Sequence, residues 1–162
     1  MRRIALVLFV SVLAGCGSSK HAVSTTTVAK PVPKPGPGQV LYDAGGWAVV
    51  VSGGAARALH LAGGSWHADT SGAVKVSILG PRGTAATTPQ VAAELSAKAP
   101  LVESGLCVDG TELDVKGGGL TPTRGTIYGA PAAPLGSGKH LAVAYGRTAG
   151  HATAVAWSFR VA

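Results

Sequence analysis

Glycine-containing turns divide the chain from Val40 to its C-terminus into short segments, and this spacing limits what the chain can fold into. The segments are rich in β-branched residues or alternate apolar with polar residues, which is typical of strands. No stretch of a dozen residues has the 3.6-residue apolar period of an amphipathic helix. We therefore predict an all-β protein built as an antiparallel sandwich or barrel.

Nine candidate strands fall between these turns. They cover residues 47–52, 57–61, 74–79, 90–97, 106–109, 112–116, 125–128, 140–147 and 153–161. Residues 91–98 could form a turn or two of helix, but Pro89 and Pro100 bound them and the turn residues that follow favour a strand. Charged residues are 13% of the chain, too few for a coiled coil, and two cysteines cannot make a disulfide framework.

The N-terminus has the three-part design of a secretory signal peptide. Two arginines follow Met1, residues 4–13 form an apolar run, and Leu-Ala-Gly-Cys occupies positions 13–16. This tetrapeptide resembles the lipobox of bacterial lipoproteins. The resemblance implies that residues 1–15 are removed and that the Cys16 thiol receives a diacylglycerol, so that acyl chains anchor the protein in a membrane.

Residues 16–38 have the composition of a disordered linker that begins at the lipidated cysteine. The prolines at its end favour an extended polyproline II conformation of roughly 3.1 Å per residue. Without Arg2 and Arg3 the chain keeps 12 Lys and Arg against 7 Asp and Glu, and residues 39–162 keep 9 against 7. A nucleic-acid-binding protein would need a clustered basic face, so we predict no nucleic-acid partner.

Residues 89–162 carry motifs of a known family. Asp109-Gly110 stands between two candidate strands, residues 135–140 read Leu-x-x-Gly-x-His, and residues 157–159 read Trp-Ser-Phe. This order resembles the immunoglobulin-like modules of bacterial envelope proteins. The resemblance implies that Asp-Gly turns a hairpin, that His140 forms a corner before the penultimate strand, and that the aromatic strand closes the domain. Residues 39–88 lack the pattern and are predicted to form a small β-meander.

Two histidines suggest a copper alternative. Ala149-Gly150-His151 resembles a segment of periplasmic copper carriers of the CopC type, and His140 could contribute a second imidazole. Those carriers have a carboxylate where Ala149 stands, and the mature chain has no methionine to bind Cu(I). We therefore predict no metal and no cofactor, with copper carriage as the alternative.

Cys107 is the remaining thiol once Cys16 is modified. A nucleophilic cysteine needs a neighbouring base, and the loop of envelope L,D-transpeptidases reads Ser-x-Gly-Cys, whereas this chain reads Ser-Gly-Leu-Cys. A small buried hydrophobe on a strand fits the position better. A thiol-dependent enzyme is the second alternative, and we predict that the chain is not an enzyme.

Trp47 and Trp66 lie beside glycine turns in the predicted meander. Exposed aromatic rings give contact area at a low cost in entropy, so these two residues are the candidate binding surface, with burial in the core as the other interpretation. Together the observations predict a lipid-anchored envelope protein facing the periplasm or the extracellular side. Its non-enzymatic Ig-like module would contact an envelope protein or a cell-wall polymer.

Overall fold

The structure is a computed structural model that describes residues 33–162. Within them the backbone forms thirteen strands and no helix. The strands are β1 (Gln39–Ala44), β2 (Trp47–Ser52), β3 (Ala55–Ala62), β4 (Ser65–Ala68), β5 (Val74–Gly80), β6 (Gly83–Ala85), β7 (Val91–Ala97), β8 (Leu101–Val108), β9 (Thr111–Glu112), β10 (Lys116–Thr121), β11 (Arg124–Gly129), β12 (Gly138–Thr148) and β13 (Ala152–Val161). Accordingly, no helix long and apolar enough to span a membrane occurs in this part of the chain. The predicted signal peptide, the lipidation site Cys16 and the linker up to residue 32 lie outside the described residues.

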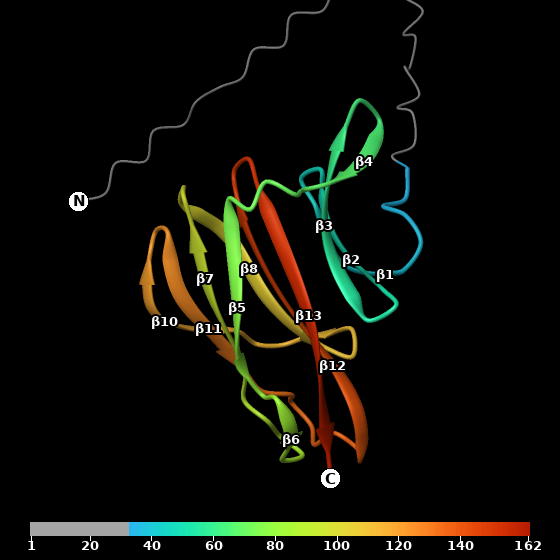
Figure 1. Ribbon diagram of the computed structural model, residues 1–162, viewed down its shortest axis with the longest axis vertical. Coiled ribbons are helices and arrows are strands. Elements are labelled where there is room, and N and C mark those ends of the chain that lie inside the picture. Colours follow the sequence, from blue (N-terminus) through green and yellow to red (C-terminus); the bar gives the residue numbers. More distant parts are fainter. Residues whose placement is uncertain (1–32) are drawn as a thin grey trace, which may run out of the picture. The chain divides into compact units, whose positions relative to one another are not determined.

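Two sheets form a sandwich (Figure 1). One has the strand order β10-β11-β7-β5 and the other β6-β13-β12-β8-β9, with antiparallel pairing except between β6 and β13. In an immunoglobulin fold, strands A, B, E and D form one sheet and strands C, F and G the other. Here β5, β7, β11 and β10 take the places of A, B, E and D, while β8, β12 and β13 take those of C, F and G. The predicted all-β, Ig-like antiparallel β-sandwich is confirmed.

The core of the sandwich comes from the inward-facing residues of both sheets. Alternate residues of β7 and β11 pack against alternate residues of β8, β12 and β13. Leu95 and Leu106 are fully buried there, and each such side chain stabilises the fold by about 1.5–3 kcal/mol relative to an exposed one. Gly146 on β12 leaves the space that Leu95 fills, since a Cβ at Gly146 would lie 3.2 Å from Leu95 Cδ2.

A third sheet of order β1-β2-β3-β4, which we call the small sheet, covers the outer face of the β8-β12-β13 sheet (Figure 1). Val49 and Val51 of β2 pack on Cys107, Val143 and Tyr145. Because β12 is covered on both faces, residues 142–146 are all buried and read as a continuous apolar run. The predicted meander is therefore a sheet that shields the sandwich.

The backbone of β8 lies directly under an aromatic ring. Tyr145 of β12 is the register partner of Gly105 of β8. A Cβ at Gly105 would overlap the Tyr145 ring, so this strand position accepts glycine alone without rearrangement. The tyrosine ring in turn contacts Tyr42 of β1, with 5.3 Å between the ring centroids.

The strand pairing contradicts the predicted boundary at residue 88 between the meander and the sandwich. Residues 74–80 pair with β7, and residues 83–85 pair with β13. The sandwich therefore begins near Val74, because Val76 and Ile78 turn their side chains into its core. Sequence patterning missed this since both strands precede the family-like motifs.

The glycines at 117–119 fall between the predicted strands 112–116 and 125–128, but they lie within β10. Gly117 and Gly118 pair with β11, and Gly119, with a φ of 60°, lies in an irregularity of that pairing. Backbone hydrogen bonds hold a glycine strand without help from side chains. The Asp109-Gly110 turn between β8 and β9 is confirmed, with φ of 50° and 84° at its two residues. Positive φ at both positions is the geometry of a type I′ hairpin turn.

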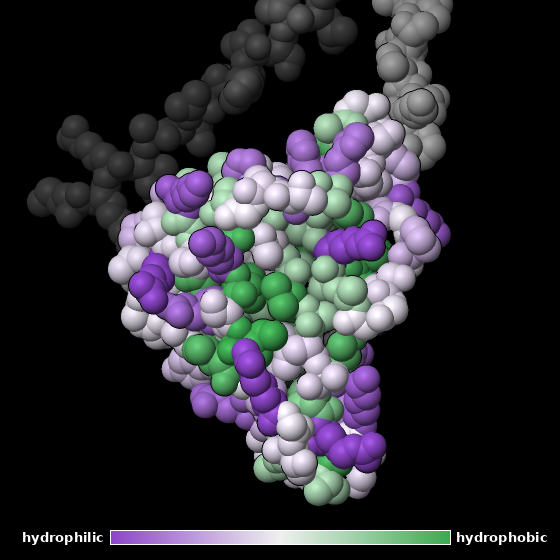
Figure 2. Space-filling model, viewed as in Figure 1, coloured by the Kyte–Doolittle hydropathy of each residue, from purple (hydrophilic) through white to green (hydrophobic). Residues whose placement is uncertain are grey.

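The surface is mixed rather than uniformly polar. Figure 2 shows hydrophobic residues along the side where β5 and β13 run next to each other, with hydrophilic residues around them. The large hydrophobic residues that are most exposed in the described range, Val40, Leu79 and Val102, belong to three different strands.

Candidate functional site

Trp66 lies on the outer face of the small sheet, the face turned away from the sandwich. It is the register partner of Leu61, next to the β3–β4 turn, and its ring is half-buried. The indole Nε1–H donates a hydrogen bond of 2.7 Å to the carbonyl oxygen of Pro33. The tryptophan therefore contacts the end of the predicted tether, 33 residues earlier in the chain.

The segment 33–38 packs against the small sheet instead of leaving it. Pro35 is buried, although its neighbours Lys34 and Gly36 are exposed. Gly38 has a φ of 133°, and a Cβ there would overlap the carbonyl oxygen of Val51. This part of the predicted disordered linker is thus in close contact with β2 and β4, and the glycine permits that contact.

A groove of about 540 Å³ lies between this segment and the sheet. The chain from Pro33 to Pro37 lines one side, and Val50, Leu59 and Trp66 line the other. Lys34 and Arg57 are the charged residues that line it, and both are cationic. We call this space the Trp66 groove.

Trp47 was paired with Trp66 as a candidate binding surface, and this prediction is wrong for Trp47. The residue is 6% exposed and packs with Ala58 and Ala152 between the small sheet and the sandwich. Its ring lies 4.5 Å from the His60 ring, centroid to centroid. The position on β2 explains the burial, because Trp47 shares the inward face with Val49 and Val51.

His151 and His140 lie at opposite ends of the β12–β13 hairpin. The register pairs His140 with Phe159, whereas His151 follows the last residues of β12. Eight residues of extended strand separate the two ends by about 25 Å. The two histidines cannot share a copper ion, and in residues 33–162 no three His, Cys, Asp or Glu side chains are placed to hold a metal.

His151 is bound instead to Asp69, whose Oδ2 lies 3.3 Å from His151 Nδ1 and accepts a 2.8 Å hydrogen bond from Ala152 N. Burial alone would raise the pKa of Asp69. The hydrogen bonds from Ser71, Ala152 and His151 outweigh burial and hold that pKa below its usual value. Asp69 thereby fastens the segment after β4 to the β12–β13 turn.

His140 forms the predicted corner. Its Nε2 lies 2.8 Å from the carbonyl oxygen of Gly136, and its Nδ1 lies 2.6 Å from Asp109 Oδ2. Both partners are acceptors, so the imidazole bonds both of them fully when both ring nitrogens carry a proton. The bonds to Asp109 and to Gly136 therefore raise the pKa of His140. The structural interpretation of His140 is confirmed.

This corner gives a pH dependence with a defined sign. A histidine whose folded pKa is raised adds stability below its unfolded pKa of about 6.5 and loses it as pH rises through the folded pKa. We expect the melting temperature of the natural chain to fall more between pH 6 and pH 8 than that of His140→Tyr. Tyrosine keeps an aromatic ring with a polar donor at this position but does not titrate in that range. If the melting temperatures of the two chains fall equally between pH 6 and pH 8, His140 is not the source of this pH dependence.

Cys107 lies on β8 under the small sheet and is 1% exposed. Burial, with a contribution from Glu112, raises the pKa of its thiol to about 11. The thiolate that a nucleophile needs is therefore scarce at neutral pH. The prediction of a small buried hydrophobe is confirmed, and Cys107 offers no accessible nucleophile to the thiol-dependent alternative.

A polar network that the sequence did not reveal joins the small sheet to the sandwich. Arg147 of β12 donates hydrogen bonds of 2.9 and 3.3 Å to Glu103 Oε2 on β8. The Tyr42 hydroxyl of β1 donates to the same carboxylate oxygen. Hydrogen bonds to a charged acceptor are stronger than neutral ones, so this network fixes the position of β1.

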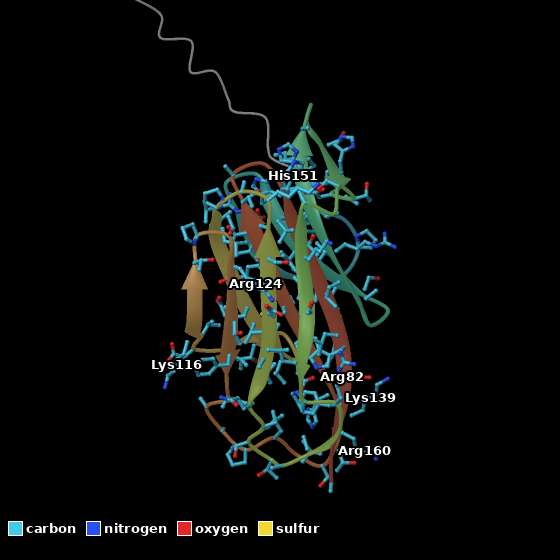
Figure 3. All side chains as sticks on the ribbon, turned by 60° about the vertical axis from the view of Figure 1, so that its left-hand side comes forward. Arg82, Lys116, Arg124, Lys139, His151 and Arg160 are labelled. Atoms are coloured by element: carbon cyan, nitrogen blue, oxygen red, sulfur yellow. The ribbon has the colours of Figure 1, made fainter. Side chains whose placement is uncertain are left out.

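The structure also brings cations together that are far apart in the sequence. Lys139 of β12 and Arg160 of β13 are register partners, and Figure 3 places them with Arg82 at the end of the sandwich away from His151. Among the described residues, none of the three has a carboxylate partner within 4.0 Å.

Comparisons with known proteins give little beyond the fold. No family model and no curated protein matches the chain. Among solved structures it is similar to the titin Ig tandem domains A164–A165, with 6% identity, a TM-score of 0.36, and coverage of 75% of each chain. The Ig-like assignment rests on the strand order and pairing described above.

Proposed function

We propose that this chain is a bacterial lipoprotein that presents a non-enzymatic Ig-like binding module in the cell envelope. The observation that carries the binding role is the Trp66 groove, where a half-buried tryptophan faces outward and a volume of about 540 Å³ remains open beside it. Aromatic side chains in such positions supply much of the binding energy of interfaces. The shielded sandwich behind it serves as a rigid support.

The anchoring role is supported by the sequence. The apolar run at 4–13 and the Leu-Ala-Gly-Cys at 13–16 indicate lipidation at Cys16. Two or three acyl chains hold a protein stably in a membrane where a single chain is marginal. The module then faces the periplasm or the extracellular side, and its partners are an envelope protein or a cell-wall polymer. Neither alternative activity gains support, because His140 and His151 are far apart and Cys107 is buried.

Chemical cross-linking in the native cell tests this function. Cross-linked peptides from the natural chain are compared by mass spectrometry with those from a Cys16→Ala chain. We expect the N-terminal peptide of the natural chain to carry acyl groups on Cys16 and the module to link reproducibly to one envelope component. The Cys16→Ala chain should lose both. An unmodified Cys16, or the same links in both chains, would overturn the anchored function.

A further inference from the structure

We propose that the Trp66 groove is a binding site for polyproline II segments, filled in cis by Pro33–Pro37, for which a proline-rich segment of a second polypeptide competes. This inference rests on the proposed function and names the partner class of the same surface. The segment seated in the groove supplies the chemistry of the ligand.

The contacts are those that a polyproline II ligand can make. A polyproline II chain has no internal hydrogen bonds, so its carbonyl groups are free to accept from outside. Proline also lacks an N–H, which leaves no donor to satisfy in an apolar groove. Trp66 supplies the donor to Pro33, and Pro35, two residues on, is the buried member of the segment. An indole donor beside an apolar groove is how aromatic-lined grooves bind such segments.

The cis segment fills the groove incompletely. Gly36 and Gly38 have φ of 102° and 133°, far from the −75° of polyproline II, so the segment cannot continue in that conformation through Gly36. An open volume of about 540 Å³ remains between Pro33–Pro37 and the sheet. Close-packed protein interfaces do not leave such volumes. A longer uninterrupted proline-rich segment would follow the groove further and fill it better.

The charges that line the groove favour an acidic ligand over a basic one. Lys34 of the cis segment and Arg57 of the sheet both line the groove, and none of the residues that line it is acidic. The chain's own segment therefore brings a like charge to a cationic surface. A ligand with glutamate in the place of Lys34 would gain attraction instead, and that gain would shrink as salt is added.

The covalent link also sets the strength of competition. A segment tethered by a short linker acts at an effective concentration of roughly millimolar. A free peptide must compete with this cis segment, so its apparent affinity for the natural chain is reduced. Removing the prolines of the cis segment should expose the full affinity of the groove.

Peptide binding to the lipidated full-length mature chain in phosphatidylcholine vesicles tests the proposal. The probe is a fluorescent heptapeptide with the sequence of residues 31–37, Pro-Val-Pro-Lys-Pro-Gly-Pro. A second probe has glutamate in place of the lysine. Fluorescence anisotropy measures the binding of each probe. The chain is used in its natural form and as an open form carrying Pro33→Ser and Pro35→Ser. Trp66→Phe in the open form keeps an apolar ring but removes the indole donor.

We expect the open form to bind the probe at least 10-fold more tightly than the natural chain, and Trp66→Phe to remove at least 10-fold of that affinity. The glutamate probe should bind about 3-fold more tightly than the lysine probe at low salt, and Arg57→Ala should abolish this difference. Thermal melts and the resistance of Cys107 to alkylation verify that each variant is folded.

The proposal is wrong if Trp66→Phe leaves the affinity of the open form for the probe unchanged. It is also wrong if the probe does not bind the open form. Soluble wall glycan that displaces the probe would assign the groove to a polysaccharide and also overturn it. If peptide binding fails while the anchor-dependent cross-links persist in the cell, the proposed function stands and the ligand class is wrong. If the peptide binds and the cross-links are absent, the groove chemistry stands without the envelope function.

Discussion

Replacing Gly105 by alanine is expected to lower the free energy of unfolding by about 3 kcal/mol, the upper range for overpacking a filled core. The added methyl group would overlap the Tyr145 ring, which lies across the β8 backbone. The ring cannot simply swing away, because Tyr42 packs against it and Cys107 and Val143 surround it. Urea unfolding followed by tryptophan fluorescence measures the change.

Gly118→Ala is the matched control for this change. Gly118 also lies in a strand and has ordinary φ, but a Cβ there would meet Tyr128 Cε1 at 3.7 Å, a normal van der Waals contact. We expect Gly118→Ala to change the free energy of unfolding by less than about 1 kcal/mol, because alanine fits without strain. Equal losses in the two variants would show that Tyr145 does not restrict Gly105.

Val49→Asp is expected to detach the small sheet and expose Cys107 to thiol reagents. Val49 packs directly in the cluster that contains Cys107, Val143 and Tyr145. A carboxylate without a partner in an apolar interface costs at least about 3 kcal/mol. That cost would raise the open population roughly 100-fold, since each 1.4 kcal/mol is a factor of ten. Alkylation of Cys107 in native buffer, timed by mass spectrometry, should accelerate by a similar factor.

Val40→Asp supplies the comparison. Val40 lies on β1 of the same sheet but is 42% exposed, so a carboxylate there stays in water. Cys107 of the Val40→Asp chain should be alkylated at the same rate as Cys107 of the natural chain. If Val49→Asp leaves Cys107 protected, the small sheet does not shield the sandwich face in solution.

The strand-by-strand outcome shows which physical rules carry over from sequence to fold. The predicted strand 153–161 is confirmed because one face of it lies in the core, and the predicted strand 140–147 is confirmed although both of its faces are covered. The Asp109-Gly110 hairpin is confirmed because few residues adopt its positive φ values. β10 was missed because glycine pairing depends on the partner strand, which local sequence does not contain.

Of the two tryptophans predicted to form the candidate site, Trp66 belongs to it and Trp47 does not. Trp66 was chosen as an exposed ring beside a turn, and the structure places it on the outer face with a groove beside it. Trp47 has the same local context but the opposite face, and a sequence cannot tell which face of a two-sided sheet is covered. The alternating prolines ending at 37 were visible in the sequence. Their contact with Trp66 depends on long-range packing.

The Ig-like sandwich here is stabilised without a disulfide bond in the described residues, where Cys107 is free. In antibody domains the second cysteine stands two residues after the corner tyrosine. The corresponding residue after His140 is Ala142, which is fully buried. In place of a disulfide bond between the sheets, β12 packs on both of its faces. Its small residues contact the sandwich core on one face, and the small sheet covers the other.

Photo-cross-linking from the Trp66 groove in the native cell tests most directly whether the chain is an anchored binding module. A photoreactive residue is placed at Ser65, on the rim of the groove, and in a second strain at Gly136, where no atom lies within 4 Å of the added side-chain position. We predict one reproducible adduct from Ser65, none from Gly136, and loss of the Ser65 adduct in a Cys16→Ala chain. Identical adducts from both positions, or none from Ser65 in the anchored chain, would contradict the binding role of the groove.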